Sequence, residues 1–305
     1  MTQLADANPT TNPSLRQADV TAAFRAGPHD RIEGGNRRLA YWRFGQGPDV
    51  VFVHGWPLSA VTFRKLVPTL SRDFTLHFFD LPGTGHTGYD DTTPIDAASH
   101  VAALRTAIDH LGLRRYSLLA HDSGGAIARY VAEGDSRVAS MVLGNTEIPG
   151  HHPALVKLLV SIARQPLSAR AFIASLGIGS IRRSALGFGG CFTDARYVDG
   201  EFGDLFVKPL VSSARVAEGH LAFARTLDFD FLDRLSAVHA RIAAPVRMVW
   251  GPEDPFFPIG KARGMVGQLP RAELVEIAGA KLFAHEDHAE QFGRLAGEHL
   301  RKHGG

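Results

Sequence analysis

The segment that most constrains the fold covers residues 116–130 and reads Tyr-Ser-Leu-Leu-Ala-His-Asp-Ser-Gly-Gly-Ala-Ile-Ala-Arg-Tyr. Its apolar first part predicts a buried strand and its last part a helix, so the chain must pass from strand to helix within one residue. Such a turn is strained and requires small residues two positions before and after it. Ala120 and Gly124 satisfy this requirement around Asp122, which we therefore predict at the apex of the turn.

The chemistry expected of Asp122 follows from that position. A carboxylate that projects from the apex, close to the N-terminus of a helix, is expected to be ionised and to attack carbon, forming a covalent ester. The alternative is an ordinary aspartate that caps the helix. If Ser123 were the apex residue, the bulky His121 would occupy one of the flanking positions. A serine esterase that uses Ser123 is kept as a separate interpretation.

The rest of the chain alternates short apolar runs with helix-length segments of period 3.6. This alternation is typical of a mostly parallel sheet covered by helices on both faces. The strands that we expect are residues 39–44, 50–53, 74–79, 116–119, 138–143, 246–250 and 273–277. The clearest helix lies between Pro94 and Gly112, with Thr93 and Asp96 as a capping box at its start.

The pattern changes at both ends of this region. Residues 1–28 are polar and rich in Pro, Asn and Thr, which predicts a flexible arm, or a strap laid on the surface, without a core. Between residues 147 and 238, helix-like stretches replace the strands, which indicates an inserted helical cap. The predicted organisation is therefore an arm (1–28), a first part of the α/β core (29–147), the cap (148–238) and a second part of the core (239–305).

Composition excludes several classes of protein. The chain has 305 residues, a net charge of +2 and one cysteine, Cys191. The small net charge gives no reason to expect nucleic acid or an anionic membrane as a partner, and one cysteine excludes an internal disulfide. The chain lacks an apolar run of about 18 residues and a leader-like start. We expect a cytoplasmic protein without a membrane span that acts on a small molecule, and a homodimer stays open.

Two further motifs follow predicted strands. His54-Gly-Trp56-Pro57 ends one strand with a turn, and residues 80–87 (Asp-Leu-Pro-Gly-Thr-Gly-His-Thr) end the next. The carboxyl ends of parallel strands meet at one edge of a sheet, where open α/β sheets bind ligands. A third motif, Trp-Gly-Pro-Glu-Asp-Pro at residues 250–255, follows a later strand. All three are therefore expected near Asp122.

As a set, these motifs resemble those of α/β-hydrolase fold proteins, in the branch of epoxide hydrolases and haloalkane dehalogenases, and the resemblance covers about residues 37 to 300. It implies that Asp122 is the nucleophile. It also implies that the backbone N–H groups of Trp56 and Ser123 form an oxyanion hole, and that Asp254 orients a histidine. Glu147 is the alternative position for the orienting acid in this branch.

The sequence departs from the family where the histidine is expected. Relatives of this pattern have a Gly-His pair after the last strand, and this chain has Lys281-Leu282 there. A leucine cannot accept a proton from water. The nearest substitute is His285, with His288 next, and we weigh His285 as the base against a solvent-facing residue at the start of a helix.

The groups that would activate a substrate also differ from the family. Epoxide hydrolases offer two cap tyrosines to the epoxide oxygen, whereas this chain has Tyr197 in the cap and Tyr89 in a core loop. Haloalkane dehalogenases place a tryptophan directly after the nucleophile, and here that residue is Ser123. Trp56 is left as the indole at a family position, and it and His54 are assigned to the substrate-binding side of the site.

We therefore expect a hydrolase that opens an epoxide, or displaces a halide, on a small apolar substrate through an ester of Asp122. The alternative, suggested by Leu282, is a non-hydrolytic cyclase, isomerase or binding protein on the same scaffold. No cofactor is expected. The pairs His151-His152 and His285–His288 lack the spacing of a metal-binding motif, so no metal is expected either.

Overall fold

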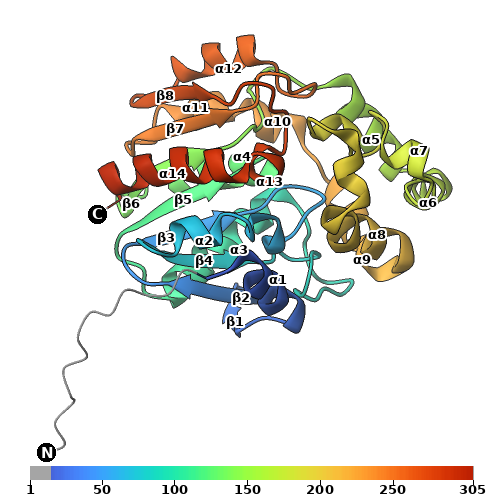
Figure 1. Cartoon of the computed structure of the whole chain (residues 1–305), viewed down its shortest axis with the longest axis horizontal. Coiled ribbons are helices and arrows are strands. Elements are labelled where there is room, and N and C mark those ends of the chain that lie inside the picture. The colour runs from blue at the N-terminus through green and yellow to red at the C-terminus, as the bar shows by residue number, and fades with distance from the viewer. Residues whose placement is uncertain (1–14, 305) are drawn as a thin grey trace, which may run out of the picture.

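The computed structural model describes residues 15–304 and shows a sheet of eight strands with helices on both faces (Figure 1). The strand order is β1-β2-β4-β3-β5-β6-β7-β8, and all neighbours from β4 to β8 are parallel, while β1 and β2 are antiparallel. The strands are β1 (Asp30–Glu33), β2 (Arg38–Gly45), β3 (Asp49–Val53), β4 (Thr75–Phe79), β5 (Tyr116–Ala120), β6 (Val138–Leu143), β7 (Val246–Trp250) and β8 (Ala272–Glu276). The predicted α/β-hydrolase fold is confirmed.

Both faces of the sheet are buried, as the apolar runs predicted. Val51 and Val53 of β3 lie in one apolar cluster, whereas Val50 and Phe52 of the same strand lie in a second cluster. Successive side chains of a strand point to opposite faces, so two separate clusters are expected when helices cover both sides. The seven predicted strands are all present. Strand β1 was missed because only Ile32 of its four residues is buried.

The core helix predicted between Pro94 and Gly112 is present. Helix α3 (Ala97–His110) starts later than Pro94, with Asp96 as its N-cap and the backbone N–H of Ser99 donating to the Asp96 carboxylate at 2.8 Å. The predicted partner Thr93 instead accepts from Arg37. The remaining core helices are α2 (Val67–Leu70), α4 (Ser123–Ala132), α12 (Ile259–Val266), α13 (Ala284–Asp287) and α14 (Ala289–His303), with the 3-10 helix η1 (Ala60–Phe63).

The prediction that residues 1–28 form an arm or a surface strap without buried residues needs correction. Residues 17–26 form helix α1 (Gln17–Ala26), and its Val20 and Phe24 are buried. The ring of Phe24 lies 5.0 Å from that of Trp42 and 5.6 Å from that of Phe78. Val20 and Phe24 are the only large apolar side chains of this helix, and two such residues give a weak periodic signal. Residues 1–14 lie outside the described part of the chain.

Every element between β6 and β7 is helical, as the sequence predicted for the inserted cap. These elements are α5 (Ala154–Ala163), α6 (Pro166–Ser175), α7 (Gly179–Arg182), η2 (Gly189–Cys191), η3 (Ala195–Asp199), η4 (Gly203–Val207), α8 (Lys208–Ser212), α9 (Ala214–Arg225), α10 (Phe229–Asp233) and α11 (Leu235–His239). Helices α5 to α9 lie together at one end of the sheet (Figure 1). Within residues 15–304, no helix has both the length and the apolar character needed to cross a bilayer.

Candidate functional site

Asp122 lies at the turn between β5 and α4, as the sequence predicted. Its backbone has φ 49° and ψ −142°, and it is the one residue other than glycine with positive φ among residues 15–304. A side chain in this conformation costs about 1–3 kcal/mol, which surrounding structure must offset. The backbone N–H of Asp122 donates to Asn145 O at 2.7 Å. A Cβ atom on Gly124 would lie 2.3 Å from Val53 O, which explains the requirement for a small residue.

The loop after β3 passes directly against the Asp122 carboxyl group. A Cβ atom on Gly55 would lie 2.5 Å from Asp122 Oδ2, so glycine permits this approach. The next residue, Trp56, donates its backbone N–H to Ser123 Oγ at 2.9 Å. The backbone N–H groups of Trp56 and Ser123 also interact with the Asp122 carboxyl and lower its pKa. These are the two groups predicted to form the oxyanion hole.

Asp122 faces a cavity of about 100 Å³ lined mainly by apolar side chains. Helices α5, α6 and α9 of the insertion form much of its wall, together with Leu210 and residues from 186–191. Loops after β3, β5, β7 and β8 form the rest. A cavity of ~150 Å³ accommodates benzene, so the space suits a substrate of a few heavy atoms. The polar side chains on this wall are Asp122, Trp56, Cys191 and His220. We call this cavity the apolar lobe.

A second cavity, of about 60 Å³, adjoins the first and is more polar. Both are lined by Trp56, Asp122 and Phe257, so Asp122 lies where the two spaces meet. Glu147 and Ser123 line only the second cavity. His151 and His152 complete its polar wall. We call this cavity the polar lobe.

The electrostatics of the site correct the expectation that Asp122 is readily ionised. Asp122 is accessible to the cavity but surrounded by protein, and this burial raises its pKa well above the ordinary value. The negative charges of Glu147 and Asp254 raise it further. Burial also raises the pKa of Glu147, although Arg129 opposes this shift. The dipole of helix α4 and two backbone N–H groups do not outweigh burial beside two other carboxyl groups.

Asp254 is held in place without a histidine. Its carboxylate accepts from Asn145 Nδ2 and from the backbone N–H of Phe256, both at 2.7 Å. Burial raises the pKa of Asp254 to about 7. Leu282, which stands where the family has its histidine, lines the apolar lobe together with Asp122. The acid of the family's acid–histidine pair is therefore present as Asp254, but a leucine stands at the position of the histidine.

The structure does not bring His285 to Asp122, which corrects its assignment as the base. His285 is 1% exposed and lies in the core, outside the residues that line either lobe. Its Nε2 and Thr62 Oγ1 share a hydrogen bond of 2.8 Å, and its ring stacks on His121 at 4.0 Å. Burial lowers its pKa to about 3. The second candidate, His288, bonds to Thr193 instead.

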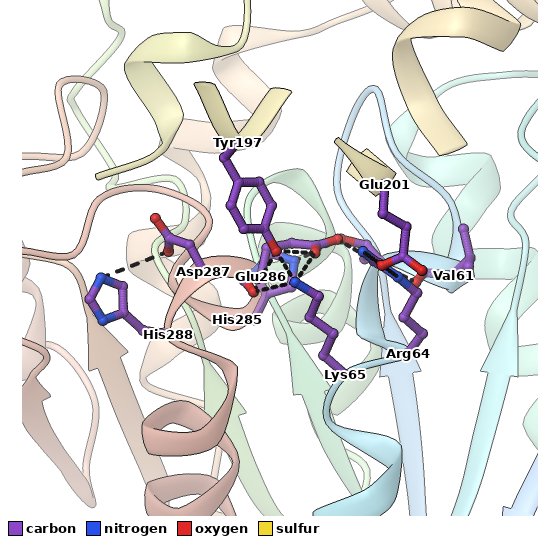
Figure 2. A network of polar contacts seen from close by, with 10 residues as sticks. Val61, Arg64, Lys65, Tyr197, Glu201, His285, Glu286, Asp287 and His288 are labelled. Carbon is purple, nitrogen blue, oxygen red and sulfur yellow. Dashed lines mark hydrogen bonds and ion pairs between the residues drawn. The ribbon is translucent and has the colours of Figure 1, made fainter. Parts of the chain in front are cut away.

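The two tyrosines predicted as oxygen donors lie elsewhere. Tyr197 belongs to a network around Glu286, where its hydroxyl donates to Glu286 O at 2.8 Å and contacts Lys65 Nζ (Figure 2). Tyr89 donates to Arg215 O at 2.6 Å near the surface. Neither lines the apolar or the polar lobe. A sequence cannot reveal this, because the direction of each side chain depends on how the insertion packs on the core.

Trp56 and His54, also predicted on the substrate-binding side, use their ring nitrogens in contacts within the protein. The indole Nε1 of Trp56 donates to His220 O at 2.7 Å, so it is not free to bind a halide. His54 is 3% exposed, and its Nδ1 lies 3.1 Å from Gly55 O. Its Nε2 accepts from the backbone N–H of Leu81 at 3.2 Å. His54 therefore joins the loops after β3 and β4 rather than lining either lobe.

His220 on helix α9 is the polar residue that sequence reasoning missed. It is 5% exposed, lines the apolar lobe, and its buried Nδ1 has no hydrogen-bond partner among the described residues. Burial lowers its pKa to about 3, so the imidazole is neutral near pH 7. Its neighbours Ala217, Leu221 and Ala224 are buried on the same helix. A histidine within a buried helical stripe is the signal that would have identified it.

The described residues offer no ready metal site. Among residues 15–304, no three His, Cys, Asp or Glu side chains are grouped so that they could hold a metal ion together. Asp122, Glu147 and Asp254 interact electrostatically, but each meets a different set of backbone and side-chain donors.

Comparisons with known proteins agree with this architecture. A family model described as "alpha/beta hydrolase fold" matches residues 48–289. A pimeloyl-[acyl-carrier protein] methyl ester esterase of Chromobacterium violaceum is 28% identical over 268 residues, which is 84% of this chain and 95% of that protein. A soluble epoxide hydrolase of Corynebacterium sp. is 31% identical over 113 residues, 37% of this chain and 39% of that protein. The solved structure of the epoxide hydrolase CorEH has a TM-score of 0.75 at 20% identity, covering 90% of this chain and 98% of that one.

Proposed function

Because the chain belongs to the alpha/beta hydrolase fold family, which its match over residues 48–289 establishes, we propose that it opens a small epoxide through an ester of Asp122. In this reaction an Asp122 oxygen bonds to a ring carbon while the bond from that carbon to the ring oxygen breaks. The ring oxygen takes up a proton and becomes a hydroxyl group. The product of this step is an alkyl ester on Asp122.

The main support for the proposal is the placement of the Asp122 carboxyl group. It projects from a strained turn into a mainly apolar cavity and faces the backbone N–H groups of Trp56 and Ser123. A carboxylate held against a small cavity is positioned for attack on a bound carbon. Its high pKa lowers the ionised fraction near pH 7 but makes the ionised form a stronger base and nucleophile.

The wall of the apolar lobe favours an epoxide over an alkyl halide. A halide would leave as a free anion in apolar surroundings, where an unpaired charge is costly. The indole N–H of Trp56, which could have bound that anion, already donates to His220 O. An epoxide oxygen stays attached to the substrate, and one neutral donor is enough to hold it. His220, whose imidazole is on the same wall, is that donor in our proposal.

An esterase that uses Ser123 has weaker support. The esterase of Chromobacterium violaceum makes this function worth testing. However, Asp122 rather than Ser123 has the strained backbone of the apex, and Ser123 is the first residue of helix α4. Ser123 Oγ also accepts from the backbone N–H of Trp56 at 2.9 Å, and Ser123 does not line the apolar lobe.

Capture of the ester tests the proposal. The protein is incubated with propylene oxide, quenched in acid and measured by intact and tandem mass spectrometry. We expect an adduct of one epoxide on Asp122. The variant Asp122→Asn should form it at least ~10³-fold more slowly, because an amide is a poor nucleophile. Labelling of Ser123 by a fluorophosphonate probe, or an adduct at any site other than Asp122, would contradict the proposal.

A further inference from the structure

We infer that Glu147 is the catalytic base that activates water to break down the Asp122 ester, in place of the family's histidine. The inference rests on the proposed function, because it concerns the second half of the same reaction. It answers the question that Leu282 raises, since the chain has no imidazole where the family has its base.

The first support is that Glu147 and Asp122 line the same cavity, the polar lobe. Both residues line this space, and the negative charge of Glu147 acts directly on the Asp122 carboxyl group. Thr146 Oγ1 lies 2.8 Å from Glu147 Oε2 and 2.8 Å from Asp122 O, so one side chain connects the two residues. Glu147 follows β6, and Asp122 follows the neighbouring strand β5.

The second support is room for water beside polar groups. The polar lobe has a volume of about 60 Å³, and one water requires only ~10–15 Å³. Its wall includes His152, whose Nδ1 is buried and has no partner among the described residues. A water needs two to four polar partners, and the polar residues that line this lobe include Asp122, Ser123, Glu147, His151 and His152. The apolar lobe on the other side of Asp122 is left for the alkyl part of the substrate.

The third support is the cation behind Glu147. Arg129 is fully buried and donates from Nη2 to Glu147 O at 2.8 Å and to Thr146 Oγ1 at 3.0 Å. Its charge favours the ionised form of Glu147, and no cation acts on Asp122 in the same way. Once Asp122 becomes a neutral ester, its repulsion of Glu147 disappears. The base is therefore available at the step that needs it.

The breakdown step balances with water as the only co-reactant. The water oxygen bonds to Cγ of the Asp122 ester, Glu147 takes a proton from that water, and the carbonyl electrons move onto the oxygen that faces Trp56 and Ser123 N–H. The bond between Cγ and the alkyl oxygen then breaks, and the departing alkoxide takes the proton from Glu147. Asp122 is left as an acid with one oxygen from water. It releases the proton that replaces the one taken up on ring opening.

The test mixes the full chain with propylene oxide in ¹⁸O-labelled water and measures how fast the Asp122 ester forms and decays. For the unaltered protein we expect the ester to form and decay, leaving one ¹⁸O atom in the Asp122 carboxyl group. Glu147→Gln has the same size and retains an oxygen near Thr146, but it cannot take a proton. We expect it to form the ester normally and to break it down at least ~10²-fold more slowly. Glu147→Asp, with a displaced carboxylate, should give an intermediate rate and serves if the glutamine variant does not fold.

A matched variant on the other lobe separates the two steps. His220→Gln removes the imidazole from the apolar lobe, so it should slow ester formation and leave breakdown unchanged. Equal breakdown in Glu147→Gln and the unaltered protein, a stable ester in the unaltered protein, or ¹⁸O absent from Asp122 would overturn the role of Glu147 while leaving ester formation standing. If no ester forms in the unaltered protein at any time point, the proposed function fails and this inference fails with it.

Discussion

Two buried carboxyl groups of this protein have opposite surroundings. Glu286 on α13 has a side chain with no solvent exposure, and Arg64 pairs with it at 2.7 Å. Thr62 and Tyr197 donate hydrogen bonds to it, and Lys65 lies 3.8 Å away (Figure 2). Asp122 faces two other carboxyl groups, and no cation is among the groups that act on it.

The difference indicates what each carboxyl group is for. The Glu286 network joins the core to the insertion, because Tyr197 and Glu201 come from the insertion and Arg64 from the core. A buried charge with partners is compatible with a structural role, since its desolvation is offset. A carboxyl group without a cation, placed against a cavity, is destabilised and reactive, and strongly shifted pKa values cluster at functional sites.

The largest effect on stability is expected at Glu286, whose buried charge has partners. Glu286→Gln removes the charge that faces Arg64 and should lower the free energy of unfolding by about 3 kcal/mol, at the lower end for breaking a buried pair. The loss is limited because Arg64 also pairs with Glu201 at 2.7 Å. Denaturant unfolding measures it. Tyr197→Phe, as control, should cost about 1 kcal/mol and leave ester formation unchanged. A loss below about 1 kcal/mol in Glu286→Gln would remove the contrast between the two sites.

Replacing Asp122 is expected to change the free energy of unfolding by less, and to raise it. Its pKa is higher in the folded than in the unfolded protein, so the folded state binds more protons between these values and loses stability as pH rises. Asp122→Asn removes that penalty. We expect this variant to be more stable by about 1–3 kcal/mol near pH 8, and the gain to disappear near pH 3, where the aspartate is protonated in both states. Lower stability of Asp122→Asn near pH 8 would show that the carboxylate is compensated after all.

The same contrast explains how far the sequence could predict the molecule. The strands and the turn at Asp122 depend on local patterns, so they were predictable. Helix α1 was not, because its buried residues are only Val20, Thr21 and Phe24, too few for a clear apolar period. The positions of Tyr197 and His220 depend on how the insertion packs on the core, and no local pattern contains that information.

The burial of His285 illustrates the same limit at the site. Its distance along the chain from Leu282 suggested that a shifted loop could bring the imidazole to Asp122. The structure instead surrounds the ring with Phe63, Phe283 and Phe292 and bonds its Nε2 to Thr62. Residue type and spacing identified a histidine near the site, but aromatic packing determined which way it faces.

The pH dependence of ester formation tests the central claim, that Asp122 is a nucleophile without a compensating cation. Single-turnover capture of propylene oxide is measured from about pH 4 to pH 10, with Asp122→Asn as the blank. Attack requires the ionised carboxylate, whose pKa burial raises well above the ordinary value. We predict that the rate of adduct formation on Asp122 keeps rising through pH 7. A rate that reaches its plateau below about pH 5, as for an ordinary aspartate, would contradict the account.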